Sequence, residues 1–198
     1  MKFIRQSVKL MLIIFFLLSG AAHSIKYHWR YEAKNTCDSY ESTLIDGINL
    51  YITERLLPTG IPQNFLGAGP PNVYLLNFIK KIGSKIYNKP EHNFSSALIV
   101  GLIYLNKYKT ILRKKGVYLD ESKIHLRFAV ALRLADKFLT DVSVRDSHFA
   151  AVIGLAPKEF KRLEREFLQE VDYNLFVKKE TFETAKKLIL LCAQKSQL

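Results

Sequence analysis

The side chains best suited to chemistry are scattered along this sequence. The five histidines follow no HExxH spacing and the two cysteines no CxxC spacing, so the sequence predicts no zinc site. The run Gly83-Ser84-Lys85 has the composition of a phosphate loop, but it falls within a helical pattern with no strand before it. Two prolines follow Gly67-Ala68-Gly69 and cannot donate the N–H groups that cradle a phosphate. We therefore expect no enzyme active site, no cofactor and no metal.

Two of the chemistry-bearing residues fall inside apolar helical patterns, where a structural role is the simpler interpretation. His125 begins a helix and is expected to pack or cap that helix rather than act as a base. Cys192 shares a face with Phe182, Ala185 and Ile189 and is expected to fill the core.

Two residues of opposite charge stand out by their positions on strongly patterned helices. Residues 124–139 carry apolar side chains on nearly every side, which is typical of a helix at the centre of a bundle, and Lys137 lies near its end. Glu164 lies at the edge of an apolar stripe on a helix that begins at Pro157. Together they could present a fixed charge pair within an apolar surface. From the residues alone, an ordinary ion pair between neighbouring helices is the simpler interpretation.

The elements around this pair are expected to be helices. Apolar residues recur at helical spacing in several segments that short loops connect, and no strand alternation or fixed repeat appears. The expected helices cover residues 44–56, 75–86, 96–112, 124–139, 145–152, 157–174 and a last segment from residue 181. A loop rich in proline and glycine occupies residues 58–71. This pattern predicts an all-α domain.

Composition and charge restrict the partners. With 198 residues, of which 48% are hydrophobic, the chain can bury one core. A net charge of +12 suits an acidic protein face, a membrane surface or nucleic acid, and a solvated lysine-rich surface explains it equally well. No arginine-rich arm or RNP aromatic motif occurs, so nucleic acid is not the expected partner.

The first residues are typical of a targeting segment. Lys2, Arg5 and Lys9 precede the apolar run 10–18, and small residues that suit a cleavage site follow. The run is short for a transmembrane helix, and membrane association through residues 1–24 stays open. In an oxidising compartment Cys37 and Cys192 could pair, and the sequon at Asn93 could carry glycan. The favoured interpretation of Asn93 is a polar cap for the following helix.

Several stretches between residues 96 and 182 resemble, in order and spacing, the motifs of one helical family. The segment Ile103-Tyr104-Leu105-Asn106-Lys107 resembles I-Y-[IL]-D-R, and the segment from Ala135 to Asp141, after His125, resembles A-A-K-F-L-D-D. Residues 149–155 are similar to W-A-K-V-G-G-I, and residues 162–168, 172–175 and 180–182 resemble R-L-E-x-x-F-L, D-[FY]-x-L and E-T-F. Together they resemble the cyclin box, specifically the single-box cyclins of the P/U type, the yeast phosphate-regulatory (Pho80-like) group.

This resemblance implies a fold and a function. The expected fold is an all-α cyclin-box bundle of about five core helices plus an N-terminal helix. The expected function is that of a regulatory subunit, which binds a cyclin-dependent serine/threonine kinase and activates it. In the family, a lysine at the position of Lys137 and a glutamate at the position of Glu164 contact the kinase beside its C-helix. Their neighbours Phe138 and Phe167 are expected to supply or support that interface.

The resemblance also suggests a division of the chain. Residues 1–24 form the signal-like or anchoring segment, residues 25–70 an N-terminal extension with one helix and a Pro/Gly linker, and residues 71–195 the cyclin box. A cyclin is expected in the cytoplasm or nucleus, whereas the N-terminal segment leaves a membrane or secretory location open.

Departures from the family pattern keep other functions open. Asn106 and Lys107 replace the family's Asp-Arg, which is expected to alter an internal ion pair. The tryptophan motif with which some cyclins dock substrate peptides is missing from the first box helix, so substrate docking is not carried over. The alternatives are a membrane-associated or secreted cyclin-fold protein without a kinase partner, and a basic adaptor in transcription.

Overall fold

The computed structural model describes residues 38–56, 71–87, 93–119, 123–141 and 144–195. They belong to one compact unit, Thr36–Leu198, while a second unit, Met1–Asn35, lies outside the described residues. The predictions for the segment 1–24 and for pairing of Cys37 therefore fall outside the described chain. No helix in the described ranges is both long enough and apolar enough to cross a bilayer.

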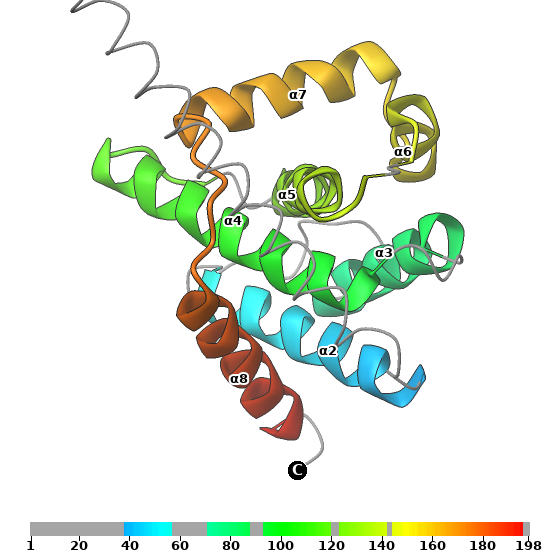
Figure 1. Ribbon diagram of the computed structural model, residues 1–198, viewed down its shortest axis with the longest axis vertical. Helices are drawn as coiled ribbons and strands as arrows, with labels where there is room; N and C mark the ends of the chain where they lie inside the picture. Colours follow the sequence, from blue (N-terminus) through cyan, green and yellow to red (C-terminus); the bar gives the residue numbers. More distant parts are fainter. Residues whose placement is uncertain (1–37, 57–70, 88–92, 120–122, 142–143, 196–198) are drawn as a thin grey trace, which may run out of the picture. The chain divides into compact units, whose positions relative to one another are not determined.

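Every regular element in these ranges is helical, which confirms the predicted all-α fold (Figure 1). In chain order they are α2 (Asp38–Tyr51), a π-helical turn η2 (Ile52–Leu56), α3 (Pro71–Ile86), α4 (Phe94–Lys114), α5 (Ile124–Leu139), α6 (Asp146–Ile153), α7 (Pro157–Glu170) and α8 (Lys179–Lys195). The predicted helix 124–139 has the same bounds as α5. The predicted short helix 145–152 corresponds to α6.

Helix α5 is the centre of the bundle, as its all-round apolar pattern predicts. Every residue from Phe128 to Asp136 is buried. Helix α4 packs along one side of α5, and α6 and α7 contact it as well (Figure 1). The approach to α4 is close because Gly101 faces the α5 backbone, where a Cβ would lie 3.0 Å from Leu132 Cα. The end of α5 that carries Lys137 is thereby fixed by packing on several sides.

Helices α2 and α8 pack against each other and against α4 (Figure 1). Their backbones nearly touch at Gly47, where a Cβ would lie 2.2 Å from the carbonyl oxygen of Ile189. The described part of the predicted extension, residues 38–56, thus packs into the same compact unit as the predicted box helices. A division between residues 70 and 71 stays a prediction, because residues 57–70 lie outside the described ranges.

Local capping explains two helix boundaries. Asn93 Oδ1 accepts a hydrogen bond of 3.0 Å from the Ser96 N–H, which confirms the interpretation of Asn93 as a helix cap. Helix α7 ends at Glu170, so its predicted extent to Asn174 is wrong. Asp172 and Tyr173 both have φ near 52°, a left-handed conformation that cannot continue a helix.

Candidate functional site

The two charged residues singled out by their positions meet in the structure. Lys137 Nζ in the last turn of α5 lies 2.6 Å from Glu164 Oε1 on α7. The Lys137 side chain is 32% exposed and that of Glu164 is 13% exposed. The pair is therefore held by neighbouring helices and still open to a partner molecule on one side.

A second carboxylate also holds the Lys137 ammonium. Asp146 lies in the first turn of α6, and its two oxygens lie 3.0 and 3.2 Å from Lys137 Nζ. Two of the three N–H donors of the ammonium are thus directed at carboxylates from α6 and α7, which leaves the third for another acceptor. The position of the lysine head depends on three helices at once.

Arg133 extends this arrangement into the core. Its guanidinium lies 2.6 Å from Asp136 Oδ2 and 2.9 Å from Asp146 Oδ1, and it also donates to the carbonyl oxygen of Val144. Arg133 and Asp136 are each 1% exposed, and the Arg133 guanidinium carbon lies 5.8 Å from the ring centre of Phe149. Because a buried charge is costly unless it is paired, these contacts fix the Arg133 head in one place.

The charge cluster, defined here as Arg133, Asp136, Lys137, Asp146 and Glu164, includes three residues that the sequence pattern did not single out. A weak signal existed, since Arg133 and Asp136 are charged, three residues apart, and lie in an otherwise apolar helix. Burial alone would raise the pKa of Asp146, but hydrogen bonds from Lys137 and Arg133, and their charges, lower that pKa below its ordinary value. The cluster therefore keeps Asp146 ionised.

The two predicted aromatic neighbours differ in accessibility. Phe138 is partly exposed next to Lys137. Phe167 is 0% exposed and stacks on Tyr108 with ring centres 4.5 Å apart. Of the two roles that the sequence left open for Phe167, only support from inside the bundle is open to a side chain without exposed surface.

The other residues considered in the sequence take part in packing or in hydrogen bonds within the bundle. His125 packs edge-on against Phe78 with ring centres 5.4 Å apart, which fits the predicted packing role. Cys192 is a buried free thiol at 7% exposure, as expected of a core residue. Lys107 donates to the carbonyl oxygen of Asn174 at 2.6 Å, and Asn106 lies 3.4 Å from the Tyr51 hydroxyl. No group of three or more potential metal ligands occurs among the described residues.

Comparison with known proteins identifies the family of this chain. The family model described as Cyclin matches residues 20–175. The chain belongs to the cyclin family. The match includes α2 as well as the helices through α7, so it begins earlier than the motif resemblance did.

Plant relatives indicate the type of cyclin. Cyclin-P3-1 of Oryza sativa subsp. japonica is 30% identical over 104 residues, which cover 52% of this chain and 42% of the relative. Cyclin-U3-1 of Arabidopsis thaliana is 27% identical over 120 residues, or 61% of this chain and 51% of the relative. Cyclin-U2-2 of Arabidopsis thaliana is 26% identical over 150 residues, or 72% and 62%. These similarities support a P/U-type cyclin, and the finer Pho80-like assignment stays a prediction.

The chain spans about half the length of the first two of these curated relatives. Membership of the cyclin family supports a regulatory role for the part of the protein described here.

Proposed function

We propose that this cyclin binds a cyclin-dependent serine/threonine protein kinase and activates it. The observation that carries the proposal is the Lys137–Glu164 pair, which is 2.6 Å apart, part-exposed and braced from behind by Asp146 and Arg133. A charge pair that is already ordered loses little conformational entropy on binding, so it can hydrogen-bond partner backbone better than an ordinary surface pair. Phe138 supplies apolar surface beside it, and Phe167 supports the pair from within the bundle.

The proposed mechanism is a shift in the conformation of the kinase. A protein kinase needs its strand lysine paired with the C-helix glutamate before phosphoryl transfer proceeds. A partner that binds only the arrangement with the C-helix inward raises the population of that state by its difference in affinity. The cyclin then needs no catalytic residue of its own.

The proposal also covers the net charge of the chain and its place in the cell. A net charge of +12 speeds encounter with an acidic kinase surface at low ionic strength. The proposed location is the cytoplasm or nucleus, where such kinases act. Membrane association through residues 1–24 stays a prediction about residues outside the described chain.

Recovery of the partner tests this function. C-terminally tagged wild-type chain is purified from its own cells beside the double variant Lys137→Ala/Glu164→Ala, and bound kinases are identified and assayed. The control is Arg162→Ala/Glu166→Ala, which removes an exposed ion pair of the same two charges within α7, together with the 3.6 Å contact of Glu166 with Arg127.

We expect a kinase with the wild type and the control, and none with the Lys137/Glu164 variant at unchanged helicity. Equal recovery of kinase by all three proteins would show that the Lys137–Glu164 pair is not part of the kinase interface. Recovery of no kinase, with glycan on Asn93, would favour the secreted alternative, and retention of nucleic acid that depends on salt would favour the adaptor.

A further inference from the structure

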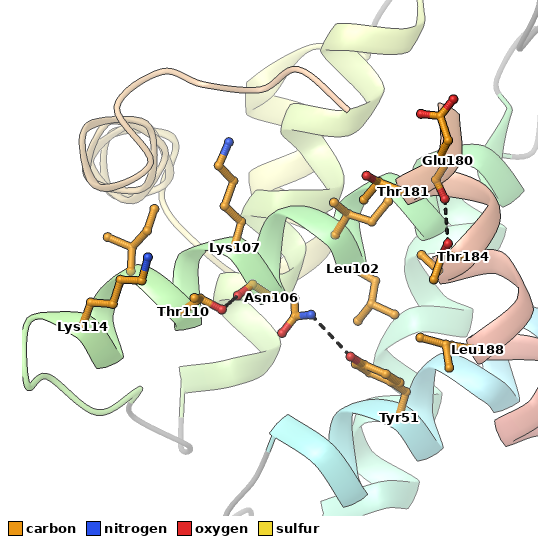
Figure 2. A pocket seen from close by; sticks show the side chains of 13 residues that line it. Tyr51, Leu102, Asn106, Lys107, Thr110, Lys114, Glu180, Thr181, Thr184 and Leu188 are labelled. Atoms are coloured by element: carbon orange, nitrogen blue, oxygen red, sulfur yellow. Dashed lines mark hydrogen bonds between the residues drawn. The ribbon is translucent and has the colours of Figure 1, made fainter. Parts of the chain in front are cut away.

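A groove on helices outside the charge cluster provides a second surface. It lies between α2, α4 and α8 and has a volume of about 640 Å³. Most of its exposed lining is apolar, and Leu102 and Ile103 from α4 and Ala185 and Leu188 from α8 contribute to it. Tyr51 of α2 closes one side, where its hydroxyl lies 3.4 Å from Asn106 Nδ2 (Figure 2).

Further apolar side chains are exposed outside the groove. Six large apolar side chains are exposed in the described chain, and they come only from the segment that follows α4, the α7–α8 connection and α8: Val117, Tyr118, Tyr173, Phe176, Leu188 and Leu191. The α7–α8 connection runs across α4, because Tyr104 donates to the Leu175 carbonyl oxygen at 2.7 Å (Figure 1). Leu188 lines the groove and is 38% exposed, and Leu191, one turn further along α8, is 55% exposed. An open groove with further exposed apolar side chains on α8 suits a macromolecular segment better than a small molecule.

The charged residues around the groove favour some partner segments over others. Figure 2 shows Lys107 and Lys114 on the α4 side of the groove and Glu180 near the start of α8. Arg113 is also exposed at the same end of α4, and the exposed Lys115 that follows lies 2.7 Å from Glu170. A second copy of this chain would bring another net charge of +12 to a basic surface, so electrostatic repulsion opposes it. An acidic segment would be attracted.

We infer that this groove binds an amphipathic helix of a partner protein whose apolar stripe is flanked by acidic residues. The apolar stripe lies between α4 and α8 on Ile103 and Leu188. The acidic flank faces Lys107 and Lys114, away from Glu180. The inference does not rest on the proposed kinase contact, because α2, α4 and α8 carry none of Lys137, Phe138, Glu164 and Phe167.

A selection followed by titration tests this site. A phage-displayed library of helices with fixed apolar positions and randomised flanks is selected on the full chain and depleted on the Leu188→Glu variant. An enriched helix is then synthesised and its affinity measured by fluorescence anisotropy. The matched variants are Lys114→Glu, which lines the groove, and Lys187→Glu, which is exposed on α8 and does not line it; both change the net charge equally.

We expect enrichment of Asp and Glu in the flanks, a loss of affinity of about tenfold in Lys114→Glu, and a change below about twofold in Lys187→Glu. Failure to enrich any helix, or flanks without acidic residues, would overturn the inference. Equal losses of affinity in Lys114→Glu and Lys187→Glu would also overturn it, because the effect would then come from the net charge of the chain and not from the groove. A dimer of the wild type that Leu188→Glu converts to a monomer would identify a second copy as the occupant and overturn it too.

Discussion

At the scale of single residues, the Lys137 ammonium lies between carboxylates from α6 and α7, and Arg133 lies behind it among Asp136, Asp146 and the Val144 carbonyl. Each cation of the charge cluster contacts two carboxylates, and Asp146 contacts both cations. The five side chains therefore act as one network. Removing one member is expected to affect the others more than its own contact would suggest.

Among the members of the charge cluster, we expect the loss of Arg133 to lower the free energy of unfolding most. Arg133→Met removes a cation that is 1% exposed and leaves Asp136, also 1% exposed, without that partner. We expect the free energy of unfolding, measured by urea denaturation, to fall by about 3–5 kcal/mol. The double variant Arg133→Met/Asp136→Ala should recover part of this loss, because the buried carboxylate that has lost the Arg133 cation is then also removed. A loss below about 1 kcal/mol in the single variant would show that the buried pair contributes little.

Because of Asp146, the contribution of the charge cluster to stability is expected to depend on pH in the acidic range. Its pKa is lowered in the folded state, so the ionised form stabilises the fold above the ordinary aspartate pKa, and that stability is lost as the pH falls further, below about 4. We expect Asp146→Asn to lower the free energy of unfolding at neutral pH by about 1–3 kcal/mol. Stability of the variant should fall less steeply than that of wild type below about pH 4.

Urea unfolding across this pH range measures both effects, with the exposed Asp172→Asn as the control. A variant that keeps the acid dependence of the wild type would contradict the role given to Asp146.

Lys137 and Glu164 could be singled out from the sequence because each lies at a recognisable place on a patterned helix. Asp146 could not, because its contact with Lys137 depends on the direction in which α6 leaves the end of α5. That direction is set by tertiary packing, and residues nine positions apart have no fixed distance outside one helix. The extent of burial of Arg133 depends on the same packing.

At the scale of helices, two glycines set how closely neighbouring elements approach. A Cβ on Gly101 would lie 3.0 Å from Leu132 Cα and 3.2 Å from its nitrogen, both rigid backbone atoms of α5. A Cβ on Gly83 would lie 2.7 Å from Phe94 Cε1, an atom near the end of a side chain. The first contact is the harder to relieve.

Gly101→Ala is therefore expected to destabilise the chain, although the same change in an exposed helix would stabilise it by roughly 1 kcal/mol. Moving α5 away from α4 should cost about 1–3 kcal/mol, measured by urea denaturation. Gly83→Ala is the comparison and should cost less, because the Phe94 ring can shift. If the Gly101→Ala variant is at least as stable as wild type, the close approach of α4 to α5 at Gly101 does not exclude a methyl group, and this prediction is wrong.

His125 makes the packing of α5 on α3 sensitive to pH. Burial lowers the pKa of His125, so the unfolded chain takes up a proton at pH values where the folded chain keeps the ring neutral. The free energy of unfolding is therefore expected to fall as the pH decreases below about 6.5, and His125→Gln should reduce this slope. Urea unfolding at about pH 7.5 and about pH 5.5 gives the comparison. Identical slopes for the two proteins would rule out His125 as the cause.

Helix positions were predictable where a local rule decides them. Residues 124–139 were correct at both ends because the apolar pattern stops there, and Asn93 was correct because a side-chain cap is a local interaction. The end of α7 was missed because the left-handed conformation of Asp172 and Tyr173 occurs at two residues that are not glycine. The pairing of α2 with α8 was also not predictable, since these helices lie far apart in the sequence.

At the scale of the whole molecule, the described helices form one unit in which α5 fixes one end of the Lys137–Glu164 pair and α2, α4 and α8 line a separate groove. Membership of the cyclin family accounts for the all-α fold. The buried Arg133 contacts Asp146, and Asp146 in turn contacts the Lys137 ammonium. We therefore predict that the Lys137–Glu164 pair is a rigid charged contact for the proposed kinase partner.

The most direct test measures kinase activity as a function of cyclin concentration. The kinase recovered with the tagged wild type is purified free of cyclin, and phosphate transfer to a substrate peptide is followed as the wild type, Lys137→Ala/Glu164→Ala or Arg162→Ala/Glu166→Ala is added. We predict saturable activation by the wild type and the Arg162/Glu166 control at similar concentrations. The Lys137/Glu164 variant should need about tenfold more protein or fail to activate. Equal activation by all three proteins, or none by folded wild type, would contradict the account.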